Sequence, residues 1–203
     1  MRHALGPLLT LDVGTRQSEE SDIDDILAEF LGGRGVGTKL AFDRIPFDAD
    51  PLGPQNRLYV AIGPMQASTT SFTGRTSATA LSPLTEGLLS SNAGGFVSRN
   101  IADTGYAAFE LVGLSDTPLW VHVTDDGVVF DPVPELAGAT VSTVVAHVDE
   151  ARGVGADAVV CIGPAGDHEV RFASMMTSGT RAFGRGGLGA VLGSKNVKCL
   201  TFA

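Results

Sequence analysis

Two arginines in a glycine-rich segment carry the clearest chemical signal in the sequence. Residues 180–189 read Thr-Arg-Ala-Phe-Gly-Arg-Gly-Gly-Leu-Gly, which places Arg181 and Arg185 four positions apart with glycines around them. Guanidinium groups donate paired hydrogen bonds to phosphate, and a glycine-rich backbone before a helix can approach an anion closely. The segment therefore predicts an anion site that leads into a helix at 188–192. A flexible surface loop with solvated arginines is the alternative.

A second glycine-rich segment, residues 91–95, reads Ser-Asn-Ala-Gly-Gly. It precedes a helix predicted at 94–103, and Asn92 is suited to cap that helix. An ordinary capped turn would give the same pattern. The glycines of 33–37 faintly resemble a dinucleotide-binding fingerprint, but a predicted helix precedes them where that fingerprint requires a strand.

Other reactive side chains fit structural roles better than catalytic ones. Cys161 lies in an apolar run typical of a buried strand. The run Asp167-His168-Glu169 could ligate a metal, but it is more typical of a polar hairpin turn. No nucleophile elbow, Walker loop or pair of CxxC motifs occurs. We therefore expect a chain that binds an anion without an acid, base or nucleophile of its own.

Composition limits the partners that this chain can have. Its 203 residues, 43% hydrophobic and 18% charged, predict one folded domain over 1–203. The 23 acids and 14 bases give a net charge of −9, which argues against nucleic acid as a partner. No apolar stretch suits a membrane span or signal core, so we expect a cytoplasmic protein without a membrane partner. Two cysteines are too few for four thiolate ligands.

Strands and helices alternate, and hairpin turns link many of the strands, which predicts an α+β fold. Helices are expected at 21–31, 35–44, 94–103 and 141–151. Strands are expected at 8–13, 58–62, 79–81, 87–90, 109–112, 119–124, 128–130, 158–162, 170–175 and 197–202.

The sequence also contains an internal echo. The run Val-Ala-Ile-Gly-Pro at 60–64 recurs as Val-Cys-Ile-Gly-Pro at 160–164, and a Gly-Arg pair follows each copy, ending at Arg75 and Arg185. The echo predicts an internal duplication into two related β-sheet units with packed helices. It also places Arg75 and Arg185 on one shared concave face.

These segments together resemble the N-terminal domain of the tungsten-containing aldehyde ferredoxin oxidoreductases over essentially the whole chain. The most specific matches are Ser-Pro-Leu-Thr at 82–85, Asn-Ala-Gly-Gly at 92–95, Ile-Gly-Pro-Ala-Gly at 162–166 and the run 181–196. The resemblance implies a base of two β-sheets related by a pseudo-twofold axis, in agreement with the echo. On this base would sit tungsten, or molybdenum, held by two pterin dithiolenes.

The resemblance also implies roles for particular residues. Arg75 would contact a pterin near a neighbouring iron–sulfur cluster. The backbone carbonyls of Asn92 and Ala182 would bind a magnesium ion that bridges the two pterin phosphates. The further residues implied to line the phosphate and pterin surfaces are Gly94, Arg181, Gly184 and Arg185.

The family's complete enzymes carry their [4Fe-4S] cysteines and acid/base residues in later domains that this chain lacks. The resemblance therefore implies that further domains, or a second subunit, supply the iron–sulfur cluster. It implies an aldehyde oxidised to a carboxylate, ferredoxin as electron acceptor, and allows a homodimer. A stand-alone scaffold derived from the family without metallopterin is the alternative, and a nucleotide-binding module would rest only on the glycine loops.

Overall fold

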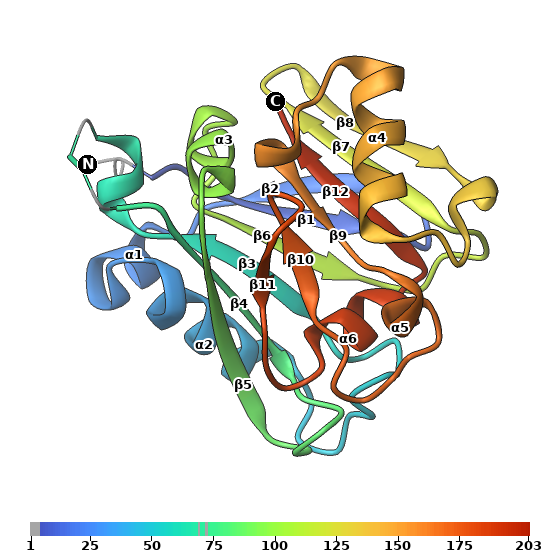
Figure 1. The fold of residues 1–203 in the computed structure, drawn as a ribbon. Coiled ribbons are helices and arrows are strands. Elements are labelled where there is room, and N and C mark those ends of the chain that lie inside the picture. Colours follow the sequence, from blue (N-terminus) through green and yellow to red (C-terminus); the bar gives the residue numbers. More distant parts are fainter. Residues whose placement is uncertain (1–4, 69, 72) are drawn as a thin grey trace.

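Two six-stranded mixed sheets, one from each half of the chain, form the frame of the molecule (Figure 1). The computed structural model describes residues 5–68, 70–71 and 73–203. The strands of the first sheet, in spatial order, are β2 (Gln17–Ser21), β1 (Leu8–Asp12), β6 (Ala108–Val112), β3 (Leu58–Ile62), β4 (Arg75–Leu81) and β5 (Leu88–Gly94). Those of the second are β8 (Gly127–Pro132), β7 (Leu119–Thr124), β12 (Val197–Phe202), β9 (Val159–Cys161), β10 (Met175–Thr177) and β11 (Arg181–Phe183).

The two sheets repeat one topology, which confirms the predicted duplication. Adding six to each strand number converts the order β2-β1-β6-β3-β4-β5 into β8-β7-β12-β9-β10-β11. The pairs β1–β6 and β7–β12 are parallel, and the other paired strands are antiparallel. The echoed runs at 60–64 and 160–164 lie at equivalent places in the two sheets, because one includes the end of β3 and the other the end of its counterpart β9.

Helices cover and join the sheets (Figure 1). The α-helices are α1 (Asp24–Phe30), α2 (Gly33–Arg44), α3 (Val97–Asp103), α4 (Val141–Arg152), α5 (Pro164–Asp167) and α6 (Leu188–Ser194). Short 3-10 turns occupy Pro64–Ala67, Pro134–Leu136 and Ala156–Ala158. No helix in the described residues is long and apolar enough to cross a membrane.

The main core lies between the sheets. Phe109 of β6 and Phe202 of β12, which are equivalent strands, pack together with ring centroids 4.9 Å apart and ring planes tilted by 47°. Helices α3 and α6 contact strands of both sheets. A second core lies under α4, where Val144 and Val148 pack with Trp120. The two units are thus held together by buried apolar surface, the main stabilising contribution in a fold of this size.

Several sequence predictions match the structure and others do not. The strands predicted at 58–62, 119–124 and 197–202 are found with those bounds. The strand predicted at 170–175 is wrong, because a turn closed by Ala173 N–H donating to Val170 O occupies that segment. The polar hairpin turn predicted at 167–169 is instead the last residue of α5 and the turn that follows this helix.

The strands β4 and β5 are longer than predicted. Their alternation is hidden by small polar residues: Ala78 and Ala80 are buried in the core, while Ser77 and Thr79 bond across to β5 on the other face. Asn92 therefore lies inside β5 and does not cap a helix, and α3 begins only at Val97.

Candidate functional site

The free edges of the two sheets meet where β5 and β11 run past each other, and we call residues 88–95 and 181–187 the seam. A side chain at Gly95 would lie 2.9 Å from Arg181 Cδ, and one at Gly186 would collide with Leu89. The two strands therefore run in opposite directions, in separate sheets. Edge strands present backbone N–H and C=O groups that no neighbouring strand uses. The seam consequently offers backbone groups from both units to a ligand.

All the site residues implied by the sequence lie on or beside this seam. Asn92 and Gly94 belong to β5, and Arg181 and Ala182 belong to β11. Gly184 and Arg185 follow β11 directly, and Arg75 begins β4 opposite Gly94. The duplication thus brings together residues 87 to 110 positions apart in the sequence. Their individual roles toward a cofactor stay predictions.

Gly94 separates two arginines that come from different units. Arg75 is its partner across the β4–β5 ladder, and a Cβ built on Gly94 would lie 3.6 Å from Arg181 Nη1. Gly95 has φ +116°, and a side chain there would press into Arg181. Glycine at position 95 therefore lets the Arg181 side chain pass close to the backbone of the first unit, whereas position 94 would hold a Cβ in ordinary contact.

A hollow of about 650 Å³ opens at this end of the seam, and we call it the arginine hollow. Among the residues that line it are Gln66, Arg75, Gly94, Gly95, Arg99 and Arg181. None of its lining residues is acidic, and none of its arginines forms an ion pair with the described part of the chain. A hollow of about 430 Å³ elsewhere is lined by acids such as Glu20 and Asp22 and would repel an anion.

Asn92 contributes to the seam through its backbone. Ser77 Oγ donates a 2.6 Å hydrogen bond to Asn92 Oδ1, so the side-chain oxygen is already engaged. The described residues contain no group of three or more His, Cys, Asp or Glu that could hold a metal ion. A magnesium ion here would depend on backbone carbonyls and on oxygens of its ligand, a donor set that Mg²⁺ accepts. The magnesium ion at the carbonyls of Asn92 and Ala182 stays a prediction.

The glycine pair at 186–187 has a packing role. Both glycines are buried with φ near +80°, and side chains there would collide with Leu89 and with Pro83. Ser82 Oγ donates a 2.7 Å hydrogen bond to Gly186 O. The pair therefore packs the second unit against the first. The prediction that its backbone binds an anion is wrong.

Arg181, and not Arg185, shares the arginine hollow with Arg75. The repeated Gly-Arg pair does not mark equivalent positions, because Arg75 begins β4 whereas Arg185 follows β11, and the counterpart of β4 is β10. Arg185 is exposed beyond the end of β11. Arg99 also lines the hollow, but it was not among the predicted site residues. Its position four residues after Gly95 is the one feature of the sequence that could have pointed to it.

The most connected ionisable group lies away from the seam. Glu110 is 1% exposed and accepts hydrogen bonds from Thr10, Arg44, Arg57 and Tyr59. Burial alone would raise the pKa of Glu110, but the hydrogen bonds from Tyr59, Arg57 and Thr10 outweigh burial and lower it. Because both carboxylate oxygens of Glu110 accept two hydrogen bonds each, this cluster ties Arg44 at the end of α2 to the first sheet and has a structural role.

Buried lysine also joins the units. Lys195 is fully buried after α6, and its Nζ donates a 2.6 Å hydrogen bond to Asn56 O of the first unit. Burial lowers its pKa from 10.5 to about 8. Its partners are carbonyl oxygens, so it acts as a cationic tie between chain segments.

A family model described as the aldehyde ferredoxin oxidoreductase N-terminal domain matches residues 8–203. The chain belongs to this family. It is 33% identical over 192 residues to the tungsten-containing aldehyde ferredoxin oxidoreductase of Pyrococcus furiosus, covering 95% of this chain and 32% of the relative. It is 30% identical over 212 residues to the WOR-like subunit of an aliphatic sulfonate oxidoreductase of the same organism, covering 96% of this chain and 34% of that subunit.

A solved structure shares the family fold throughout. A chain of the active-site complex BamBC of benzoyl-coenzyme A reductase, solved with 1,5-dienoyl-CoA, superimposes with a TM-score of 0.94 at 28% identity. The match covers 100% of this chain and 31% of that chain. The present chain thus spans about a third of the length of these relatives.

Proposed function

We propose that this chain, over 1–203, is the metallopterin-binding domain of a tungsten-dependent oxidoreductase, with the seam as its cofactor site. The observation that carries the proposal is that Arg75 of the first unit and Arg181 of the second line one hollow at the seam, together with Gly94 and Gly95. Anionic pterin phosphates and dithiolenes match these guanidinium groups, which form no ion pair with the described part of the chain. The tungsten-containing relatives support the same class of cofactor.

Each seam residue binds or orients in this proposal. Arg75 and Arg181 would bind the anionic parts of the cofactor, and Gly184 and Arg185 would extend the binding surface beyond β11. The backbone carbonyls of Asn92 and Ala182 would supply oxygen ligands to a magnesium ion. When bound, tungsten or molybdenum would supply the redox chemistry that converts an aldehyde and water to a carboxylate, three protons and two electrons.

The remaining parts of the enzyme come from elsewhere. Cys161 and Cys199 face each other across the β9–β12 ladder, and both are buried in the core under α4. Burial raises the pKa of the Cys161 thiol to about 12 and also raises that of Cys199, so neither is a ready thiolate ligand. We infer that further domains or a second subunit carry the [4Fe-4S] cluster, that ferredoxin accepts the electrons, and that the enzyme works in the cytoplasm, with a homodimer as one assembly.

Metal and pterin retention test the proposal. The chain is produced together with the rest of its enzyme in a host that makes tungstopterin, and tungsten and pterin are measured per folded protein. Arg181→Ala should lower retention about tenfold, because it removes a charge-assisted contact worth roughly 1.5–3 kcal/mol.

Arg34→Ala is the matched control for that experiment. Arg34 is an exposed arginine that lines a different, apolar groove with Phe30 and Phe42. Its substitution changes the net charge equally and should leave retention unchanged. Equal retention in both variants, or no tungsten in the unmodified enzyme, would favour the scaffold without metallopterin.

A further inference from the structure

A chain of hydrogen bonds runs beneath the end of α4, across two strands of the second sheet. Trp120 Nε1 of β7 donates a 2.7 Å hydrogen bond to Thr201 Oγ1 of β12. The same hydroxyl lies 2.7 Å from Nδ1 of His122, two residues further along β7. Each of these three residues is buried, with 9% or less of its surface exposed. They therefore form one polar network inside the second unit.

The donors and acceptors of this network require a neutral imidazole. An indole N–H can only donate, so Thr201 Oγ1 accepts from Trp120 and has one proton of its own to give. His122 Nδ1 is within reach of that proton, and it can accept only when it carries no proton itself. A proton on Nδ1 would turn a second donor toward Thr201 and leave the hydroxyl proton without this acceptor, which is costly in a buried site.

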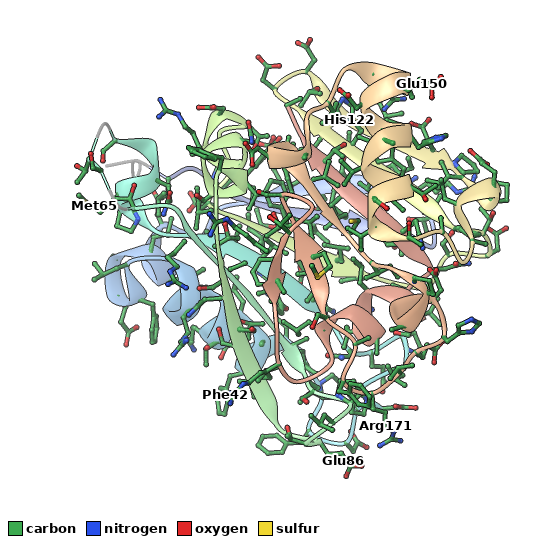
Figure 2. All side chains as sticks on the ribbon, in the orientation of Figure 1. Phe42, Met65, Glu86, His122, Glu150 and Arg171 are labelled. Atoms are coloured by element: carbon green, nitrogen blue, oxygen red, sulfur yellow. The ribbon has the colours of Figure 1, made fainter. Side chains whose placement is uncertain are left out.

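A cation already lies over this network. The Arg152 guanidinium at the end of α4 is 4.6 Å from the centre of the Trp120 ring and pairs with Asp131 of β8. Figure 2 shows His122 beside this end of the helix. Burial lowers the pKa of His122, and the charge of Arg152 lowers it further, while Asp131 acts in the opposite direction. An imidazolium here would therefore repel the group that holds α4 on the sheet.

Two more titratable side chains face the network. His147 of α4 has its ring 6.3 Å from the Trp120 ring and its Nε2 3.8 Å from Glu135 Oε1, so water and an acid screen a charge on it. Cys199 lies two residues before Thr201 on β12, and burial raises the pKa of its thiol, so it is uncharged in acid. His122 is therefore the imidazole whose protonation the network itself registers.

We propose that His122 is a proton-operated catch for the C-terminal end of α4. While the imidazole is neutral, the network is complete and Arg152 rests on Trp120. Uptake of one proton at Nδ1 breaks the bond from Thr201 and adds a positive charge beside Arg152, so the last turn of α4 leaves the sheet. The catch works without any cofactor at the seam.

The direction of the pH dependence follows from the folded state. Because the pKa of His122 is lowered on folding, the unfolded or released form binds the proton more readily than the closed form. The neutral imidazole therefore stabilises the closed form above the ordinary histidine pKa of about 6.5. This contribution is lost as the pH falls through the lowered value, so mildly acidic pH opens the catch.

Trp120 reports on the catch, because it is the single tryptophan among the 203 residues. Its fluorescence emission and its quenching by acrylamide are measured on the purified chain between about pH 8 and about pH 5. As the pH falls below about 6.5, the emission maximum should move to longer wavelength and quenching should rise at least about twofold, because the ring becomes open to water. A change that appears only with loss of the far-ultraviolet circular dichroism signal would be general unfolding and would overturn the proposal.

Three variants identify the group that responds. His122→Asn removes the titration but keeps an oxygen that can accept from Thr201, so its fluorescence should stay constant over the same range. His147→Asn removes the other imidazole near Trp120 and should keep the transition of the unmodified chain. Arg152→Ala uncovers the ring, so quenching should already be high at about pH 8 and change less than about twofold in acid.

Each of these measurements can contradict the catch. The proposal is overturned if the unmodified chain shows no transition, if His122→Asn keeps the transition, or if His147→Asn loses it. It is also overturned if Arg152→Ala is quenched as weakly at about pH 8 as the unmodified chain, because the end of α4 would then not cover Trp120.

Discussion

At the scale of single residues, the surroundings of an arginine in the fold decide whether it can bind an anion, and its position in the sequence does not. Arg181 crosses from the second unit to lie against Gly95 of the first, and Arg75 approaches the same glycine pair from β4. Either side chain alone would be an ordinary exposed arginine. Their convergence on glycine gives the local positive charge that an acidic chain needs to bind an anion.

Lys195 makes stability depend on pH in an unusual direction. Its pKa is lowered to about 8 in the folded chain from an ordinary 10.5. Between these values the unfolded chain binds more protons, so the free energy of unfolding rises with pH. We expect the unmodified chain to gain about 1–2 kcal/mol over Lys195→Met between about pH 8 and pH 9.5.

Urea denaturation of both proteins across that range measures the effect. Thiols and tyrosines are shared by the two proteins, so their titration cancels in the difference. If the free energies of unfolding of the two proteins change by the same amount across the range, Lys195 stays charged or is not buried.

The residues predicted from the sequence lie together on the seam, but their arrangement could not be predicted. Glycine clusters and a family resemblance are visible in the sequence alone, and they pointed to Asn92, Gly94, Arg181 and Ala182. Arg99 could not be predicted, because nothing in a single sequence says that α3 borders the hollow that Arg181 also lines. The hollow exists only once two units are packed together.

At the scale of elements, alternation of apolar and polar residues predicted the buried strands well. It failed for β11, which has three residues, and for β2, whose five residues include no apolar side chain. Pairing of β2 with β1, and not its own composition, makes it a strand. The helix predicted from residue 21 accordingly begins at Asp24, after β2 has ended.

The C-terminal end of α4 is bound to the sheet beneath it. Arg152 looks like a solvated helix end in the sequence, yet its guanidinium lies 4.6 Å from the centre of the Trp120 ring and pairs with Asp131 of β8. Arg152→Ala should lower the free energy of unfolding by about 1–2 kcal/mol, because a partly shielded cation–π contact and ion pair are lost together.

Glu150→Ala is the control for Arg152→Ala. Glu150 is exposed on the same helix and projects outward in Figure 2. Its substitution should change stability by less than about 0.5 kcal/mol. Thermal unfolding of the two variants distinguishes them, and similar melting temperatures would show that Arg152 does not anchor α4.

At the scale of the whole molecule, the junction of the two units depends on glycine and on loops from both halves. Near the far end of the seam, Arg171 of the second unit donates a 3.2 Å hydrogen bond to Pro83 O and lies beside Glu86 (Figure 2). The glycine at 186 lies against Leu89 of the same region. Short-range patterns cannot reveal such contacts, although the echo in the sequence does reveal that two units exist.

Gly186→Ala tests whether this junction holds the units together. Its φ of +82° and the collision with Leu89 should together cost about 2–4 kcal/mol. Gly138→Ala has a similar φ of +71° but open space around it, so it should cost only about 1–2 kcal/mol. Urea denaturation compares the two, and an equal cost would show that backbone strain alone matters.

The placement of each unit's last strand has a consequence for synthesis on the ribosome. Strands β6 and β12 each lie inside their sheet, between β1 and β3 or between β7 and β9. The first sheet can be completed once Val112 has emerged, whereas the second remains split until the chain has been made as far as Phe202. During that interval Phe109 has no Phe202 to cover it, and the inner face of the first unit is exposed as a surface that chaperones bind.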